Sequence, residues 1–367
     1  MNTKNILITG ARAPVAIQMI RSLKKEGHRI FITDSTHLVI AKKSRDIVDF
    51  FQTPAPNENI EAYIFALQAI VEKVDIDWII PLCEEVFYIA TYKNRFKTHV
   101  FVDCFGKLQM MHHKGEFCDW MIAHGFHAPK SAFVTNQQEL QTFVKASKKE
   151  SFILKKPYSR FANGTKRMTK EEVIGHTDFP VVIQEFIIGR EWCTYSIAVE
   201  DGVTTAIYPS DIHYHDGATI YYENTRYEQL EQIVEQIIQQ LDWYGQIAFD
   251  VIECKESKRL YFIECNPRAT SGACFIDGAA WFGKTLSQAG AFQLTPLMIL
   301  KWVRRPNRPL FRKIKKAKDL FGFSDGIGLY LAQFQVMIGW FFTARKLNCS
   351  MSEATTKDIE WNGETLQ

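Results

Sequence analysis

The sequence predicts an α/β protein that opens with a Rossmann-like parallel sheet and continues into α+β subdomains. Residues 5–34 contain an apolar strand, an amphipathic helix and a second apolar strand, which is the order of a βαβ unit. Residues 245–266 contain two apolar runs on either side of a charged turn, which is the pattern of a β-hairpin. The chain has 367 residues, enough for two or three domains.

The composition excludes several classes of function. Hydrophobic residues make up 46% of the chain and charged residues 23%, which is ordinary for globular proteins. The net charge of +3 is too small to indicate a nucleic-acid partner, and none is expected. The eight cysteines are scattered without a C-x-x-C pair, so neither a zinc ribbon nor a disulfide scaffold is indicated. These cysteines and an N-terminus without a signal-peptide pattern predict a cytoplasmic protein.

The first domain is expected to span residues 1–104. Asp34 follows the second strand, where a Rossmann unit often has an acidic residue. The glycine fingerprint is incomplete, however, because Arg12 and Val15 stand where glycines would let a pyrophosphate approach. The βαβ fold is therefore indicated without NAD binding. An NAD-dependent oxidoreductase, which Gly10 and Asp34 alone would suggest, is not favoured.

The rest of this domain adds a helix, two strands and a candidate ligand site. A helix is predicted near residues 58–74, and strands are predicted at 77–81 and 98–102. Glu84 and Glu85 follow the first of these strands, at the edge where open α/β sheets bind ligands. Acidic residues also suit a helix N-terminus, and that interpretation is stronger for Glu85 than for Glu84.

The second unit carries lysines at the end of a strand. Residues 107–124 have an apolar stripe that predicts one helix. The strand that begins at Ser151 ends at Lys155 and Lys156, and a loop of small and polar residues follows as far as Gly164. A lysine at a strand end beside such a loop can hold phosphates, although a solvated hairpin has the same pattern.

Further elements are predicted before the hairpin. The runs at 181–188 and 192–198 are expected to be paired strands, and residues 227–241 an amphipathic helix. The loop between them carries His213 and His215. This H-x-H pair lacks an evident third ligand, so a metal site there is not favoured.

The hairpin at 245–266 gives the strongest chemical signal. Asp250 lies fourteen residues before Glu264 across the turn, so antiparallel pairing would place the two carboxylates opposite each other. Asn266 is two residues after Glu264 and therefore points the same way. Facing carboxylates repel unless a cation lies between them, and oxygen ligands suit Mg²⁺. We therefore expect a site for one or two Mg²⁺ ions here, with Arg268 beside it to hold phosphate. For Glu264 and Asn266 alone, the alternative is a solvated strand end.

Together these segments resemble the ATP-grasp superfamily, of the carbamoyl-phosphate-synthase-like or carboxylate–amine ligase type. The resemblance covers about residues 1–290 and depends on segments that occur in a characteristic order. They are Lys155-Lys156-Pro157 with its loop, Gln184-Glu185-Phe186-Ile187, Asp250, and Phe262-Ile263-Glu264-Cys265-Asn266-Pro267-Arg268. The resemblance implies a pre-ATP-grasp domain at 1–104, an ATP-grasp domain at 105–299 with a lid at about 130–190, and an accessory helical region at 300–367.

The resemblance implies roles at the nucleotide site. Lys107 and Lys156 would contact the ATP phosphates, with Lys155 as the alternative to Lys156, and the loop from Ser159 to Gly164 would fold over them. Adenine and ribose would be contacted by residues at the end of the lid and just after it. These residues are Gln184, Glu185, Phe186, Ile188 and Glu191.

The resemblance also implies the catalytic and metal-binding groups. Asp250, Glu264 and Asn266 would ligate Mg²⁺, or Mn²⁺ in its place. Arg268 would stabilise the phosphorylated intermediate, and Arg268 and Lys156 are the catalytic candidates.

The implied substrate pocket lies between the first domain and the ATP-grasp domain. Its candidate residues are Asp34, Cys83, Glu84, Ser271 and Gly272, together with the loop at 213–219. ATP would phosphorylate a small carboxylate, and an amine or similar nucleophile would then displace phosphate from the acyl phosphate. Two alternatives stay open: a carbamoyl-phosphate-synthase-like kinase of a small acid, and a non-catalytic nucleotide-binding protein.

The C-terminal region lies outside the common core of this family. Residues 326–344 are nineteen in number and uncharged, near the lower limit for a membrane span. Their two glutamines and three glycines favour a buried or interfacial helix instead. Basic residues precede the segment at 312–318 and follow it at Arg345 and Lys346. We therefore expect peripheral contact of residues 300–346 with the inner face of a membrane, and we retain a homodimer as an expectation.

Overall fold

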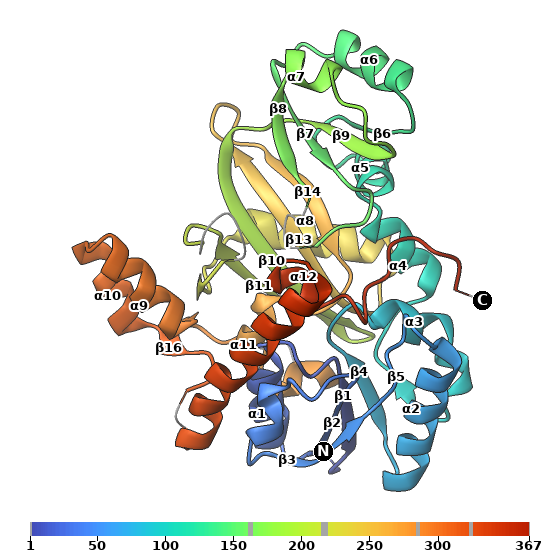
Figure 1. The fold of residues 1–367 in the computed structure, drawn as a ribbon, viewed down its shortest axis with the longest axis vertical. Coiled ribbons are helices and arrows are strands. Elements are labelled where there is room, and N and C mark those ends of the chain that lie inside the picture. The colour runs from blue at the N-terminus through green and yellow to red at the C-terminus, as the bar shows by residue number, and fades with distance from the viewer. Residues whose placement is uncertain (1, 161–163, 214–218, 284–286, 323–325, 367) are drawn as a thin grey trace.

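A five-stranded parallel sheet with strand order β3-β2-β1-β4-β5 forms the base of the molecule (Figure 1). The structure is a computed structural model that describes residues 2–160, 164–213, 219–283, 287–322 and 326–366. Ile6 at the centre of the sheet pairs with Ile30 on one side and Trp78 on the other. The strands are β1 (Asn5–Thr9), β2 (Arg29–Asp34), β3 (Ile47–Gln52), β4 (Trp78–Pro81) and β5 (His99–Val100).

Helices cover this sheet and confirm the predicted Rossmann-like unit. They are α1 (Ala16–Lys25), α2 (Ile60–Val74) and α3 (Val86–Thr91), with short 3-10 turns η1 (Ile40–Lys43) and η2 (Lys93–Arg95). Asn59 caps α2 by accepting a hydrogen bond from the Ala62 backbone N–H. The edge strand β3 was not predicted, because its apolar run is short and Asp49 interrupts it.

The helix expected at 107–124 is two helices, α4 (Phe105–His112) and α5 (Lys114–Ala123). His113 separates them with an extended backbone (φ −71°, ψ 112°), and its Nδ1 accepts a hydrogen bond from the Glu116 N–H. The apolar stripe continues across the break, which is why the sequence suggests one helix. The break makes Lys114 the first residue of α5, and α5 packs against β14.

A small four-stranded sheet with its own core forms the top of Figure 1. Its order is β6-β9-β7-β8, from β6 (Ser131–Val134), β7 (Ser151–Lys155), β8 (Lys166–Thr169) and β9 (Val181–Glu185). Helices α6 (Gln137–Ala146) and α7 (Lys170–Ile174) pack against it.

A second four-stranded sheet occupies the middle of the molecule. Its order is β11-β10-β13-β14, from β10 (Gly189–Val199), β11 (Gly202–Pro209), β13 (Gly245–Cys254) and β14 (Leu260–Asn266). Helix α8 (Glu228–Gln240) shares a core with Phe249 and Phe262 of this sheet.

The expected pairing of 181–188 with 192–198 is wrong, because β9 and β10 belong to different sheets. The chain crosses from one sheet to the other between Glu185 and Gly189. Gly189 makes the crossing tight, since a Cβ at this position would lie 2.1 Å from the Glu253 carbonyl oxygen. A glycine therefore marks a change of sheet here and not a hairpin turn.

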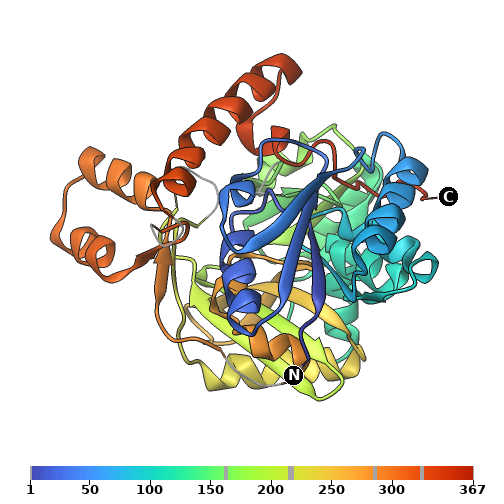
Figure 2. The ribbon, with the colours of Figure 1, turned by 90° about the horizontal axis from the view of Figure 1, so that it is seen from below.

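The remaining elements extend to one side of this core. A third sheet joins β12 (Tyr221–Glu223), β15 (Ala291–Gln293) and β16 (Lys318–Asp319), and η3 (Ser271–Phe275) and η4 (Gly278–Phe282) follow β14. Helices α9 (Thr295–Arg304) and α10 (Arg308–Lys316) form a hairpin that projects away from the body (Figure 2).

Helix α11 (Ile327–Leu347) lies across the first domain, and α12 (Met351–Ala354) follows it. Gly339 lets α11 approach Leu38, whose Cδ2 would lie 2.4 Å from an added Cβ. Among the described residues, no helix is long and apolar enough to cross a membrane.

Candidate active site

The β13–β14 hairpin places Asp250 directly opposite Glu264, as the spacing predicted. A bulge follows Asp250 in this ladder. Asn266 is two residues after Glu264 on β14, and its Nδ2 lies 3.5 Å from Asp250 Oδ2. Burial and the facing Glu264 raise the pKa of Asp250 to about 6. Two carboxylates that disfavour each other's charge form an environment that a divalent cation would relieve.

The residues present fit a Mg²⁺ ion that shares its ligands with a nucleotide. Among the described residues, no group of three His, Cys, Asp or Glu side chains could hold a metal ion. Asp250, Glu264 and Asn266 instead supply two carboxylates and one amide. Mg²⁺ in phosphate sites is typically bound by one or two carboxylates and completed by phosphate oxygens and water, so this set suffices.

Lys114 is the cation closest to these carboxylates, and the sequence interpretation did not include it. Its Nζ lies 3.1 Å from Glu264 Oε1 and also donates to the Ser159 carbonyl oxygen at 3.1 Å. Burial alone would raise the pKa of Glu264, but the charges of Lys114 and Lys155 outweigh burial and hold it below the ordinary value. The ammonium of Lys107 lies elsewhere. It is 3.2 Å from Asp103 Oδ2, and it donates a hydrogen bond to the backbone carbonyl oxygen of Asp242, just after α8.

Of the two neighbouring lysines, Lys155 is the one that points at the hairpin. It is buried, and its Nζ donates to the Ile263 carbonyl oxygen at 3.3 Å. Burial lowers the pKa of Lys155, while the nearby charge of Glu264 opposes this effect. Lys156 is exposed, and its side chain lies against Gly164 at the other end of the loop.

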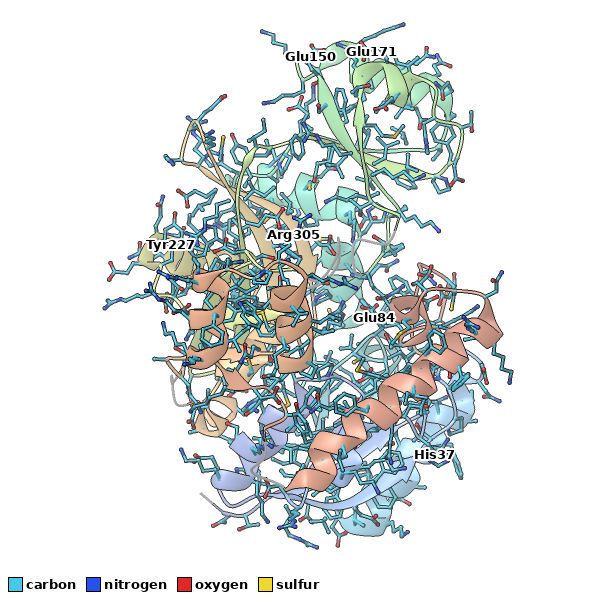
Figure 3. The ribbon with its side chains drawn as sticks, turned by 60° about the vertical axis from the view of Figure 1, so that its left-hand side comes forward. His37, Glu84, Glu150, Glu171, Tyr227 and Arg305 are labelled. Atoms are coloured by element: carbon cyan, nitrogen blue, oxygen red, sulfur yellow. The ribbon has the colours of Figure 1, made fainter. Side chains whose placement is uncertain are left out.

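Glu84 lies near the middle of the molecule, where the first domain meets the hairpin (Figure 3). Its Oε1 accepts from Arg268 Nε at 2.6 Å, and its Oε2 lies 2.8 Å from Arg160 Nε and 3.6 Å from His112 Nε2. Burial would raise the pKa of Glu84, but the two guanidinium groups hold it far below the ordinary value. Burial also lowers the pKa of His112 to about 3, so this imidazole is neutral at pH 7.

Arg268 connects Glu84 to strand β14. Besides its bond to Glu84, it donates through Nη2 to Asn266 Oδ1 at 3.2 Å. The structure therefore brings Glu84, Arg268 and Asn266 together, as the sequence predicted. It adds Arg160, which lies in the loop after β7 and has no sequence pattern that would identify it.

The other predicted substrate residues line the carboxyl edge of the first sheet or the start of η3. Asp34 is bound to Arg12, whose Nε donates to Oδ1 at 2.9 Å. Cys83 Sγ lies 3.5 Å from the Gly10 carbonyl oxygen, and burial raises the pKa of its thiol, so it is not poised as a nucleophile. Ser271 and Gly272 open η3, where an added Cβ on Gly272 would lie 2.4 Å from Tyr195 Cβ.

The predicted adenine-side residues take several environments. Gln184 is buried and donates to Ser131 Oγ at 3.2 Å, while Glu185 Oε1 accepts from Ser147 Oγ at 2.5 Å. The ring of Phe186 lies under the Arg167 guanidinium, 3.9 Å from its centroid.

Ile188 and Glu191 line a cleft of about 760 Å³ at the beginning of β10. Charged side chains of both signs surround this cleft, and its other lining residues are Gly189, Arg190, Ser210, Asp211, His213, Glu253, Lys255 and Lys258. Residues 161–163 of the loop predicted to fold over phosphates and residues 214–218, which include His215, lie outside the described residues.

Comparison with known proteins identifies the domain that contains these groups. Residues 111–272 match the family model described as an ATP-grasp domain, so the chain contains an ATP-grasp domain and the predicted resemblance is confirmed. No curated protein sequence matches. The matched range includes Lys114, Lys155, Asp250, Glu264 and Asn266.

Solved structures share the wider fold at low sequence identity. N5-carboxyaminoimidazole synthetase from Staphylococcus aureus in complex with ADP is 14% identical, with a TM-score of 0.62 over 78% of this chain and 80% of that chain. Biotin carboxylase from Campylobacter jejuni is 15% identical, with a TM-score of 0.63 over 79% and 74%. L-amino acid ligase from Bacillus licheniformis is 14% identical, with a TM-score of 0.55 over 77% and 69%.

Replacing Glu84 by Gln should destabilise the fold, because two buried guanidinium groups would lose their shared carboxylate. We expect the free energy of unfolding to fall by about 3 kcal/mol, measured by urea unfolding at pH 7. The matched control is Glu61→Gln, which removes an exposed pair with Arg95 and should have a much smaller effect, because solvent screens this pair.

The effect of Glu84→Gln should also depend on pH. The folded-state pKa of Glu84 lies below its ordinary value, so its contribution is complete above about pH 5 and is lost as the pH falls. The difference between wild type and variant should therefore shrink in acid. Equal stability of the two proteins at pH 7 would contradict the role assigned to Glu84.

Proposed function

We propose that this protein is an ATP- and Mg²⁺-dependent ligase that activates a small carboxylate as an acyl phosphate for attack by an amine or similar nucleophile. The observation that carries the proposal is the pair of facing carboxylates, Asp250 and Glu264, with Lys114 and Lys155 beside it. Half-buried carboxylates with buried cations beside them are what a Mg-nucleotide requires. The similar structures support the same class, since they include ligases and an ADP complex.

The nucleotide would lie between the lid sheet and the hairpin. We assign its phosphates to Lys114 and Lys155, which are buried beside the carboxylates, and leave Lys156 at the rim of the loop that spans Ser159 to Gly164. Lys107 is held by its own acidic partner, so we assign it no phosphate. The backbone from Glu185 to Ile188 would meet adenine, and Glu191 in the adjoining cleft would meet ribose.

Asp250, Glu264 and Asn266 would hold the metal, and Mn²⁺ could replace Mg²⁺ there. When bound, this ion would bridge phosphate oxygens and neutralise the charge that develops on them. Lys114 and Lys155 add fixed positive charge on the same side. Because these groups are buried and prealigned, little reorganisation is needed during the reaction.

The chemistry follows from the position of Arg268. A substrate carboxylate oxygen would attack the γ-phosphorus, and the bond to ADP would break. The amine would then attack the acyl carbon, lose a proton and release phosphate. Arg268 lies between Asn266 and Glu84, so it can stabilise the acyl phosphate while Glu84 keeps the guanidinium in place.

The acceptor pocket would be lined by Asp34, Cys83, Glu84, Ser271 and Gly272. Two other functions use the same cleft: a carbamoyl-phosphate-synthase-like kinase that stops at the acyl phosphate, and a nucleotide-binding protein without turnover. Intact Asp250, Glu264, Asn266 and Arg268 favour catalysis over the second of these.

The test is the release of ADP and phosphate from Mg-ATP across a panel of carboxylates, each with and without amines, followed by product mass. We expect release that needs both a carboxylate and an amine, and Glu264→Ala should lower turnover by about 100-fold or more. Release without any amine would favour the kinase. Full turnover in Glu264→Ala would overturn the metal assignment.

Metal affinity should fall in mild acid. Because the pKa of Asp250 is raised to about 6, a proton competes with the metal below this pH. We expect the apparent affinity for Mn²⁺ in the presence of ADP to drop by up to about tenfold per pH unit between pH 6 and pH 5. Titration calorimetry at pH 5, 6 and 7 measures this. An affinity independent of pH would contradict the role of Asp250.

The partners follow from the same proposal. Carboxylate and amine substrates are small molecules, and no nucleic acid is involved. All eight cysteines are free thiols, which suits a cytoplasmic enzyme. We also propose a homodimer, by analogy with the biotin carboxylase domain dimer of Hydrogenobacter thermophilus 2-oxoglutarate carboxylase, which is 11% identical with a TM-score of 0.62 over 79% of this chain and 74% of that chain.

We propose that the α9–α10 hairpin contacts an anionic membrane surface on the cytoplasmic side. Residues 295–316 contain eight Lys or Arg residues and no Asp or Glu. Apolar side chains are exposed among these cations: Ile299, Leu300, Val303 and Phe311. Cations with interspersed apolar side chains suit anionic lipid headgroups, and the hairpin projects from the body where a membrane could reach it (Figure 2).

Vesicle sedimentation tests this surface. The protein should bind phosphatidylcholine vesicles that contain phosphatidylglycerol, and less so at high salt. Arg312→Glu with Lys315→Glu should lower the partition coefficient at least about tenfold, since each cation near the surface contributes roughly 1 kcal/mol. The control is Lys148→Glu with Lys149→Glu, the same charge change on an exposed lid loop. Equal binding by both double variants would contradict the proposal, and dimer loss in the first variant alone would indicate a subunit interface.

A further inference from the structure

A segment near the C-terminus contacts both the first domain and the loop that follows β7. We call residues 355–364 the C-terminal strap. The strap leaves α12, passes the carboxyl ends of the first sheet and reaches α3 and α4 (Figure 1). These two helices are far from the strap in the sequence. Residues more than 200 positions apart thereby contact each other, and two of these contacts involve buried arginines.

One end of the strap is bound to the first sheet through Arg12. The Arg12 guanidinium donates to both oxygens of Asp358, at 2.5 Å from Nη1 and 2.8 Å from Nη2, and Ser35 Oγ donates to Asp358 at 2.6 Å. The same guanidinium binds Asp34 on its other edge. The Arg12 side chain is 4% exposed and that of Asp358 is 28% exposed, so this bidentate pair is buried on the arginine side and partly open to solvent on the other.

The other end of the strap is bound to the loop that follows β7. Arg160 Nη1 donates to Glu360 Oε2 at 3.1 Å and to Asn362 Oδ1 at 2.9 Å, and Nη2 donates to the Trp361 carbonyl oxygen. Trp361 is fully buried, and its ring lies 4.8 Å from that of Tyr158 and 5.0 Å from that of Phe87. The strap thus contacts both the loop and the first domain.

The loop segment held by the strap is bound to the metal-binding strand as well. Ser159 accepts from Lys114, which pairs with Glu264. Arg160 pairs with Glu84, which pairs with Arg268. One chain of polar contacts therefore runs from the strap through Arg160 and Glu84 to Arg268, which we assign to the acyl phosphate. Lys114, which we assign to phosphate, is reached through the backbone, because Ser159 precedes Arg160 in the loop.

We propose that the C-terminal strap is a positioning element for residues 158–160 of the phosphate loop, and through them for Lys114 and Arg268. This inference rests on the proposed function. A loop that must close over ATP loses conformational entropy when it does so, and a strap that already holds it lowers that cost. Glu360 and Asn362 are the positioning residues, since they bind Arg160 with side-chain oxygens.

The test uses Mg-ADP as the probe, so it needs no knowledge of the acceptor. Glu360→Gln with Asn362→Ala removes the carboxylate and the amide oxygen from Arg160 and keeps Trp361. We expect the dissociation constant for Mg-ADP, measured by calorimetry, to rise about tenfold, and Asn362→Asp to retain near wild-type affinity because its carboxylate can bind Arg160.

The matched control is Lys357→Ala, an exposed residue of the same strap that does not contact the loop. Its affinity for Mg-ADP should equal that of the wild type. Thermal unfolding of each variant shows whether the fold is kept. If the melting temperature of the double variant is more than about 5 °C below that of the wild type, the Mg-ADP affinity of the single Asn362→Ala variant is used as the test instead.

The outcomes separate the two levels of inference. A wild type that fails to bind Mg-ADP would overturn the proposed function itself. A wild type that binds, with the Arg160-releasing variant binding equally well, would overturn the strap inference alone. Once an acceptor is identified, a rise in KM for ATP together with a fall in kcat would distinguish positioning from a purely structural role, which would change only the melting temperature.

Discussion

The arrangement of this molecule depends on the ion pairs of the buried Glu84 carboxylate. Glu84 belongs to the first domain, yet its partners are Arg268 at the end of the hairpin and Arg160 in the loop of the lid. A buried charge is tolerable only with close partners, so these three segments must come together. Glu84 thereby determines how the domain that would hold the acceptor meets the domain that would hold ATP.

A second group of interacting charges lies on the β13–β14 hairpin. Asp250 and Glu264 face each other, and within the part of the chain that the structure describes Glu264 has an ion pair with Lys114 whereas Asp250 has none. The pKa values reflect this inequality, because that of Glu264 is lowered and that of Asp250 is raised to about 6. The charge of Lys155 offsets only part of the rise at Asp250, so Asp250 is the carboxylate on which a metal ion would have the largest effect. Uneven compensation of this kind is expected at functional sites, where a ligand completes the electrostatics.

The sequence predicted what depends on local pattern. The facing carboxylates followed from the length of the turn between two apolar runs, and the first sheet followed from its apolar strands. Lys114 was missed because an apolar stripe continues through the break at His113, and only the backbone there shows that a new helix begins. Arg160 could not be predicted, since its partners at 84 and 360–362 are distant in sequence and none of them belongs to a recognisable motif.

Arg12 joins these observations. In the sequence Arg12 argued against NAD binding, since its bulk stands where a dinucleotide-binding loop has glycine. In the structure its guanidinium fills that position, bound by Asp34 on one edge and by Asp358 of the strap on the other. Arginine at position 12 therefore has two physical consequences. It closes the first sheet to a pyrophosphate, and it provides the cation that binds the end of the chain over the carboxyl edge. A first domain of this kind can serve as one wall of a site whose nucleotide would be bound by the other domain.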